Sequence, residues 1–124
     1  MKTKPQLDTL TTVDSLRKEV REFMQERNWE RYHSPKNLSM SIAIEAAEIM
    51  EHFQWYTSEE SRKLVEDEQA WAQVTDEVAD VLIYCLTLAN QLNMDISTAV
   101  TSKLERRRSR YPIGYMPTKS ETSS

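Results

Sequence analysis

The sequence predicts an all-α protein. Only one of its 124 residues is glycine and four are proline, so long stretches contain no residue that interrupts a helix. In these stretches apolar residues recur at the spacing of an α-helix, whereas the turn chemistry of β-hairpins is almost absent. A chain of this length is expected to form one domain that gains from a partner subunit, because small domains bury only a limited core.

Five segments combine helical periodicity with capping residues, and we expect helices over about residues 12–27, 37–55, 57–67, 69–92 and 96–110. Thr12 is the expected N-cap of the first segment, and Thr57 with Glu60 forms a capping-box pattern at the third. Asn93 and Asp95 are expected to end the long helix and to cap the last one. The first, second, fourth and fifth segments predict a four-helix core.

The two ends of the chain differ in composition from its centre. Residues 1–11 contain Pro5 and several threonines without a hydrophobic period, so we expect a flexible N-terminus. Residues 113–124 are rich in serine and threonine and are expected to form a disordered tail. The domain is therefore expected to span residues 12–112.

Cysteine usage and hydropathy predict a cytoplasmic protein. Cys85 is the only cysteine and lies on an apolar part of the long helix, so a disulfide framework is excluded. The sequence contains no signal-peptide pattern and no apolar run of about twenty residues, so neither secretion nor membrane insertion is expected.

The net charge of the chain is −4, and its acidic and basic residues are unevenly distributed along the sequence. Residues 37–102 contain twelve acidic residues but only two basic ones, whereas residues 103–110 contain five basic residues and one acidic residue. Because the bulk of the chain would repel a polyanion, nucleic acid is not an expected partner. A small phosphate ligand bridged by cations fits this distribution better.

The long helix contains two carboxylates three residues apart in an otherwise apolar setting. A polar stripe about 80° wide runs along it and comprises Glu77, Asp80, Tyr84, Thr87 and Gln91. Apolar residues occupy much of the remaining circumference, which indicates burial on several sides. Buried carboxylates need a positive partner, and no lysine or arginine occurs between Lys63 and Lys103.

The second segment repeats this arrangement. Glu45 and Glu48 lie on one side of the helix with His52, next to its core stripe, and Met40 with Ile44 begins a second apolar strip. Two helices with two apolar faces each predict a subunit interface. Antiparallel packing of these helices would direct both acidic pairs to one site.

Four clustered carboxylates indicate a site for a hard divalent cation. Mg²⁺ prefers oxygen ligands and is usually held by carboxylates together with substrate phosphates, and Mn²⁺ is the expected substitute. A carboxylate that the metal does not fully engage can orient or deprotonate a water, which predicts hydrolysis. A di-iron centre fits poorly because such bundles carry E-x-x-H, and the residue three before His52 is Ile49.

The motifs E-A-A-E at residues 45–48 and E-V-A-D at residues 77–80 resemble the E-x-x-E and E-x-x-D signature of MazG-like all-α nucleoside triphosphate pyrophosphohydrolases. The stretches RNWERYHSPKNL, EHFQW, DEVADVLIY and SKLERRRSRYP are similar to the dCTP pyrophosphatase branch, so the resemblance covers roughly residues 16–112. It implies a four-helix MazG-like bundle completed by homodimerisation, as a dimer or a dimer of dimers. It also implies cleavage of a nucleoside triphosphate to the monophosphate and pyrophosphate.

The resemblance implies a role for each residue that matches a motif. The expected magnesium ligands are Glu45, Glu48, Glu77 and Asp80, with Glu48 or Glu45 as the base. The expected substrate-binding residues are Trp29 and Trp55 around the base, Tyr84 against the deoxyribose, and Lys103, Arg107 and Arg110 on the phosphates. His33 is also an expected substrate-binding residue, because it lies in the aromatic loop of residues 28–36. The alternative is that this loop is only a packed connection between two helices.

Two departures from the resemblance leave base selectivity open. Val20 stands where some relatives have a base-pocket histidine, and Arg107 stands where asparagine is common. The substrate is thus dCTP, a 5-modified dCTP, dUTP or a broader set. An alternative of another class is a non-catalytic helical dimer that acts as an interaction module, in which the acidic pairs would point to bulk water.

Overall fold

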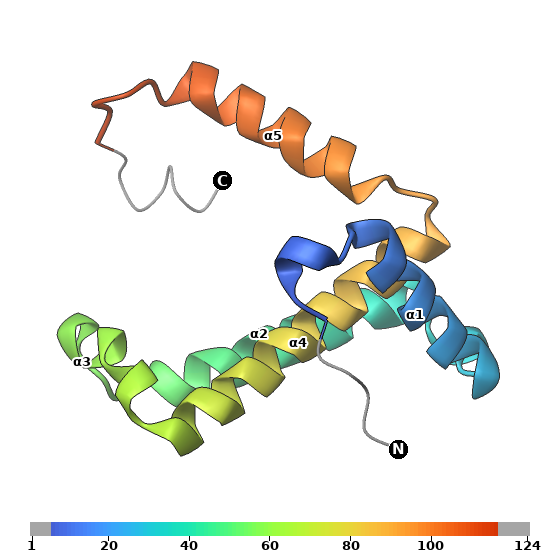
Figure 1. Ribbon diagram of the computed structural model, residues 1–124, viewed down its shortest axis with the longest axis horizontal. Coiled ribbons are helices and arrows are strands. Elements are labelled where there is room, and N and C mark those ends of the chain that lie inside the picture. The colour runs from blue at the N-terminus through green and yellow to red at the C-terminus, as the bar shows by residue number, and fades with distance from the viewer. Residues whose placement is uncertain (1–5, 117–124) are drawn as a thin grey trace. The chain divides into compact units, whose positions relative to one another are not determined.

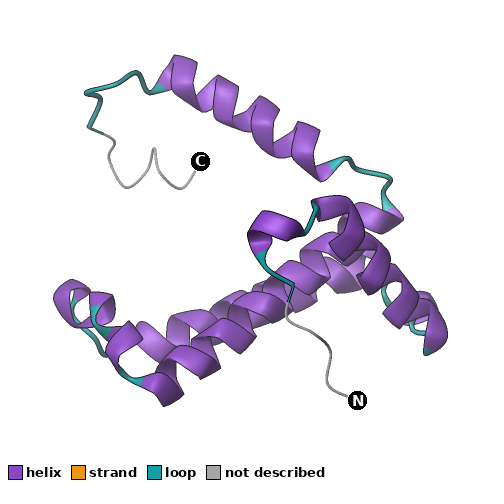
Figure 2. Ribbon diagram, viewed as in Figure 1, coloured by secondary structure: helices purple, strands orange, loops and turns teal. Residues whose placement is uncertain are grey.

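The computed structural model describes residues 6–116, and throughout this range the chain forms helices and turns without a β-strand (Figure 2). The all-α prediction is confirmed. Parts of the expected flexible N-terminus and disordered tail, residues 1–5 and 117–124, lie outside the described residues. In the described part, no helix combines the length and the apolar character that crossing a bilayer requires.

The α-helices lie close to the expected ranges and are α1 (Val13–Glu26), α2 (Pro35–Phe53), α3 (Ser58–Arg62), α4 (Glu68–Gln91) and α5 (Ile96–Arg110). Short 3₁₀ helices cover Asp8–Leu10, Glu30–Tyr32 and Leu64–Glu66. The expected helix over residues 57–67 is therefore two pieces, because α3 ends at Arg62 and a 3₁₀ turn follows.

Side-chain caps fix the helix starts. Thr12 accepts a hydrogen bond from the Ser15 amide, and Thr57 and Glu60 form the reciprocal capping box that the sequence predicts. Helix α2 begins at Pro35, two residues before the expected start. The reason is local: Ser34 caps the helix, and a proline at the first helical position needs no hydrogen-bond partner for its nitrogen.

Two asparagines end helices in the left-handed backbone conformation. Asn28 has a φ of 54° after α1, and Asn93 has a φ of 51° after α4. Asparagine tolerates this conformation better than most residues with a side chain, so it serves where glycine otherwise stops a helix. The expected stop at Asn93 and the expected cap at Asp95 are both confirmed.

The chain divides into two units, residues 1–93 and 94–124, and α5 is the helix of the second. In the first unit α2 and α4 lie side by side, and α1 packs against α4 (Figure 1). The pairing of α2 and α4 is antiparallel: His33, just before α2, contacts Tyr84, whereas Glu45 farther along α2 lies against Glu77. The acidic pairs therefore meet near the middle of both helices.

The first unit buries few large apolar side chains. Met24, Leu38 and Ala89 are buried, and Cys85 is partly buried, which raises the pKa of its thiol. By contrast, large apolar side chains on α2 and α4 remain exposed, among them Met40, Ile44, Val78 and Leu82. Helices α2 and α4 thus each carry exposed apolar residues, where the sequence predicts burial in a subunit interface, and that interface stays a prediction.

Candidate functional site

Three glutamates from α2 and α4 form a close group. One carboxylate oxygen from each of Glu45, Glu48 and Glu77 lies within 4.8 Å of the other two. Glu45 and Glu48 share a face of α2 because they are three residues apart, and the antiparallel pairing brings Glu77 of α4 opposite them. Asp80 is exposed and stands outside this close group, although its charge acts on both Glu45 and Glu77.

The group has unsatisfied acceptors. Glu45 Oε2 and Glu77 Oε2 are shielded from solvent and have no hydrogen-bond partner. The ion pairs of Lys18 with Asp14 and of Arg27 with Glu26 neutralise other carboxylates. A purely solubilising acidic patch would present these oxygens to bulk water, so their burial counts against a non-catalytic interaction module.

Mutual repulsion and burial raise the pKa values of the group. The pKa of Glu45 rises from 4.5 to about 7, mainly through burial, then through a hydrogen bond with the carboxyl group of Glu48 and through the nearby charges of Glu48 and Asp80. The pKa of Glu77 is also raised, chiefly because the carboxyl group of Glu48 lies against it. Clustered, partly shielded carboxylate oxygens that lack cationic partners fit a hard divalent cation such as Mg²⁺.

The raised pKa of Glu45 predicts how the stability of the metal-free protein depends on pH. The carboxyl group keeps its proton in the folded state up to about pH 7 but loses it near pH 4.5 in the unfolded state. The stabilising effect of this proton is fully present below the unfolded pKa and is lost as the pH rises through the folded pKa. The melting temperature in EDTA is expected to fall across this window, measured by circular dichroism.

Glu45→Gln is the control, because it removes the titrating group and should flatten this slope. Mg²⁺ binds the deprotonated carboxylates, so the increase in melting temperature that it produces should grow as the pH rises. Equal melting temperatures in EDTA and in millimolar Mg²⁺ at neutral pH would count against a metal site here.

Three of the expected substrate-binding residues form a continuous aromatic row. The Trp29 and His33 rings are 6.4 Å apart, and the His33 and Tyr84 rings are 6.1 Å apart, both edge to face. Phe23 of α1 extends the row, 5.5 Å from Trp29, and was not among the predicted site residues. His33 Nδ1 is buried without a hydrogen-bond partner. The aromatic loop therefore packs against α4 one turn beyond Asp80.

Trp55 lies elsewhere. Its side chain is 86% exposed, and it follows α2, whereas Trp29 precedes that helix. A helix of 19 residues is roughly 28 Å long, and Trp29 precedes its first residue while Trp55 follows its last, so the two tryptophans stand beyond opposite ends of it. One chain alone does not bring them to the same base.

The expected phosphate-binding residues share a hollow in the second unit. Lys103, Arg107 and Arg110 line a cavity of about 240 Å³ together with Arg106 and Tyr111. Arg106 was not among the predicted site residues, although it belongs to the arginine run of residues 106–108. Four cationic side chains around one hollow suit an anion.

Comparisons with known proteins identify the family to which the chain is similar. The model of the MazG-like family matches residues 40–122, a range that contains all four expected carboxylate ligands. Rat dCTP pyrophosphatase 1 is 36% identical over 102 residues, which cover 82% of this chain and 60% of the rat protein. Human dCTP pyrophosphatase 1 is 38% identical over 101 residues, which cover 82% of this chain and 59% of the human protein. The chain thus spans about 60% of the length of these relatives.

A solved structure is similar over nearly the whole chain. It is a pyrophosphatase from Archaeoglobus fulgidus DSM 4304 that superposes with a TM-score of 0.74 at 38% identity. The match covers 90% of this chain and 99% of the archaeal one. The helical fold is therefore shared with a protein of similar size.

Proposed function

The chain belongs to the MazG-like family, and we propose that it hydrolyses a nucleoside triphosphate to the monophosphate and pyrophosphate in a Mg²⁺-dependent reaction. The proposed substrate is dCTP or a 5-modified dCTP, because the rat and human relatives are named for dCTP. Hydrolysis of dUTP, or of a broader set of nucleoside triphosphates, would follow the same reaction. Such an enzyme would remove unwanted nucleotides from a cytoplasmic pool, with residues 12–112 as the catalytic domain.

The observation that carries this proposal is the close group of Glu45, Glu48 and Glu77, with two shielded oxygens that have no partner. These three residues, with Asp80 beside them, would hold Mg²⁺, and Mn²⁺ would substitute for it. The bound cation would neutralise phosphate charge and lower the pKa of a coordinated water.

The remaining roles in the proposed reaction belong to side chains of this protein. Glu45 and Glu48 are the candidate bases, and a carboxylate oxygen of one would accept the proton of the attacking water. Tyr84 and His33 would contact the sugar, and Trp29 would cover one face of the base. Lys103, Arg107 and Arg110 would donate hydrogen bonds to the phosphates, where charge develops during cleavage.

A homodimer, alone or within a dimer of dimers, completes this proposal. Apolar side chains on α2 and α4, such as Ile44 at 59% and Leu82 at 55% exposed, would be covered by the same helices of a second copy. The separation of Trp29 and Trp55 also favours a homodimer, because Trp29 of one chain and Trp55 of the other could then enclose the same base. Trp55 would then act in the site of a partner subunit.

The test is a nucleotide panel with product identification. The pure protein is incubated with each of the common ribonucleoside and deoxyribonucleoside triphosphates and Mg²⁺, and products are separated by anion-exchange chromatography. dCTP is expected to give dCMP and pyrophosphate. Release of orthophosphate, or no turnover of any triphosphate with Mg²⁺ or Mn²⁺, would rule the proposal out.

A further inference from the structure

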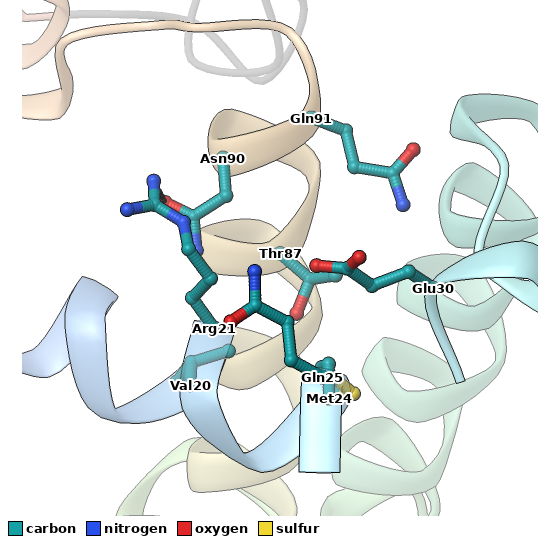
Figure 3. A pocket seen from close by; sticks show the side chains of 8 residues that line it. All are labelled: Val20, Arg21, Met24, Gln25, Glu30, Thr87, Asn90 and Gln91. Atoms are coloured by element: carbon teal, nitrogen blue, oxygen red, sulfur yellow. Dashed lines mark hydrogen bonds between the residues drawn. The ribbon is translucent and has the colours of Figure 1, made fainter. Parts of the chain in front are cut away.

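A second hollow lies in the first unit between α1 and the C-terminal part of α4, apart from the glutamate group. Its volume is about 340 Å³, within the range of small-ligand pockets. It is lined by Val20, Arg21, Met24, Gln25, Glu30, Thr87, Asn90 and Gln91 (Figure 3). Met24 and Thr87 are each only 4% exposed and form its buried floor.

The rim of this hollow carries hydrogen-bonding groups that are not in use. Within residues 6–116, the side chains of Gln25, Glu30 and Gln91 make no hydrogen bond. Figure 3 shows the Glu30 carboxylate extending toward Thr87, with the amide of Gln25 beside it. A pocket with a buried floor and several free polar groups at its rim is suited to a flat polar ligand.

Interactions between α1 and α4 hold the hollow in shape. Arg17 Nε and Arg21 Nη2 donate to Asn90 Oδ1 at 3.0 and 3.2 Å, and Asn90 Nδ2 donates to the Arg17 carbonyl at 3.1 Å. Asn90 is thereby fixed, and Arg21 keeps further N–H groups free for a ligand. The Thr87 hydroxyl donates to the Ile83 carbonyl at 2.8 Å, which leaves its oxygen as an acceptor.

The hollow continues the polar stripe of α4 that begins at the glutamate group. Thr87 lies seven residues after Asp80 on the same helix, about 10 Å along its axis. Tyr84, with the His33 ring against it, lies between these two residues. A nucleotide whose phosphates lie near the carboxylates and whose sugar lies near Tyr84 would therefore place its base toward this hollow.

We propose that this hollow receives the edge of the nucleobase and that Glu30 selects bases with an exocyclic amino group. This inference rests on the proposed function. A carboxylate only accepts hydrogen bonds, so it pairs with the N4 amino group of cytosine and repels the O4 carbonyl oxygen of uracil at the same place. The side-chain amides of Gln25 and Gln91 present both donors and acceptors, so they can pair with the remaining polar groups of either cytosine or uracil.

Glu30→Gln tests this selection. Glutamine keeps the size of the side chain but offers both a donor and an acceptor, so it pairs with either base. The ratio of kcat/KM for dCTP to that for dUTP is expected to fall by about tenfold or more. Glu66→Gln, the same change in another 3₁₀ helix, should leave this ratio unchanged. An equal loss for both substrates in Glu30→Gln would overturn the assignment, because it would indicate a structural role alone.

A binding measurement separates this inference from the proposed hydrolysis. The protein is labelled with [methyl-¹³C]methionine and titrated with dCMP and with dUMP in the absence of metal. The Met24 methyl resonance, identified through Met24→Leu, is expected to shift with dCMP at lower concentration than with dUMP. Met50, which is 63% exposed on α2, serves as the internal control.

The combined outcomes are distinct. A Met24 shift in a protein that hydrolyses no triphosphate would refute the proposed reaction and support the base pocket. Turnover of dCTP with a Met24 resonance that dCMP leaves unchanged would support the reaction and overturn the base pocket.

Discussion

Glu48→Gln is expected to lower kcat for triphosphate hydrolysis by about a hundredfold or more while the fold is retained. Glu48 belongs to the close group with Glu45 and Glu77, so the change removes a negative charge that would hold the cation, and a weakly held cation would neutralise the reacting phosphate less well. The same substitution should raise the melting temperature in EDTA, because it relieves the repulsion that raises the pKa of both neighbouring glutamates. Asp80→Asn is expected to lower kcat in the same way.

The matched control is Glu51→Gln, an exposed position on the same helix outside the glutamate group. Its kcat should stay close to that of the unmodified protein. A Glu48→Gln protein that kept full kcat with Mg²⁺ would remove the glutamate group from the mechanism, whatever its effect on stability.

Ile44→Asp is expected to convert the proposed dimer to monomers at micromolar concentration. Ile44 is 59% exposed on α2 and lies on the apolar strip that also carries Met40. In the proposed dimer, an unpaired carboxylate at this position would enter an apolar interface, which costs on the order of several kcal/mol and disfavours association. Light scattering coupled to size-exclusion chromatography gives the mass directly.

Ser39→Asp introduces the same charge on another side of the same helix and should leave the mass unchanged. If the unmodified protein is itself a monomer at this concentration, the proposed dimer is wrong, and the exposed apolar strips on α2 and α4 need a different cover.

Local signals in the sequence predicted most of the fold. Helix ends followed from single residues, such as Thr12 as a cap and Asn93 as a stop, because capping depends on groups within one turn. The early start of α2 was missed because Ser34 and Pro35 were assigned to a loop. Their combination of a cap and a proline at the first helical position was a readable signal.

The glutamate group was predictable because it follows from spacing and antiparallel packing. The helical wheel placed Asp80 on the same stripe as Glu77, but its shorter side chain stands outside the close group. Thr87 and Gln91 belonged to this stripe as well, without a predicted role. The hollow that they line depends on how α1 docks on α4 through Arg17 and Asn90, which are 73 residues apart, and periodicity does not reveal such contacts.

Manganese titration followed by electron paramagnetic resonance tests the central claim most directly, because free Mn²⁺ gives a six-line signal that weakens on binding. The unmodified protein is expected to reduce this signal at micromolar Mn²⁺, and Mg²⁺ should restore it by competition. A variant with glutamine at positions 45, 48 and 77 should leave the signal at the level of a protein-free solution. Equal Mn²⁺ binding by the unmodified protein and this variant would contradict a metal centre built from these three glutamates.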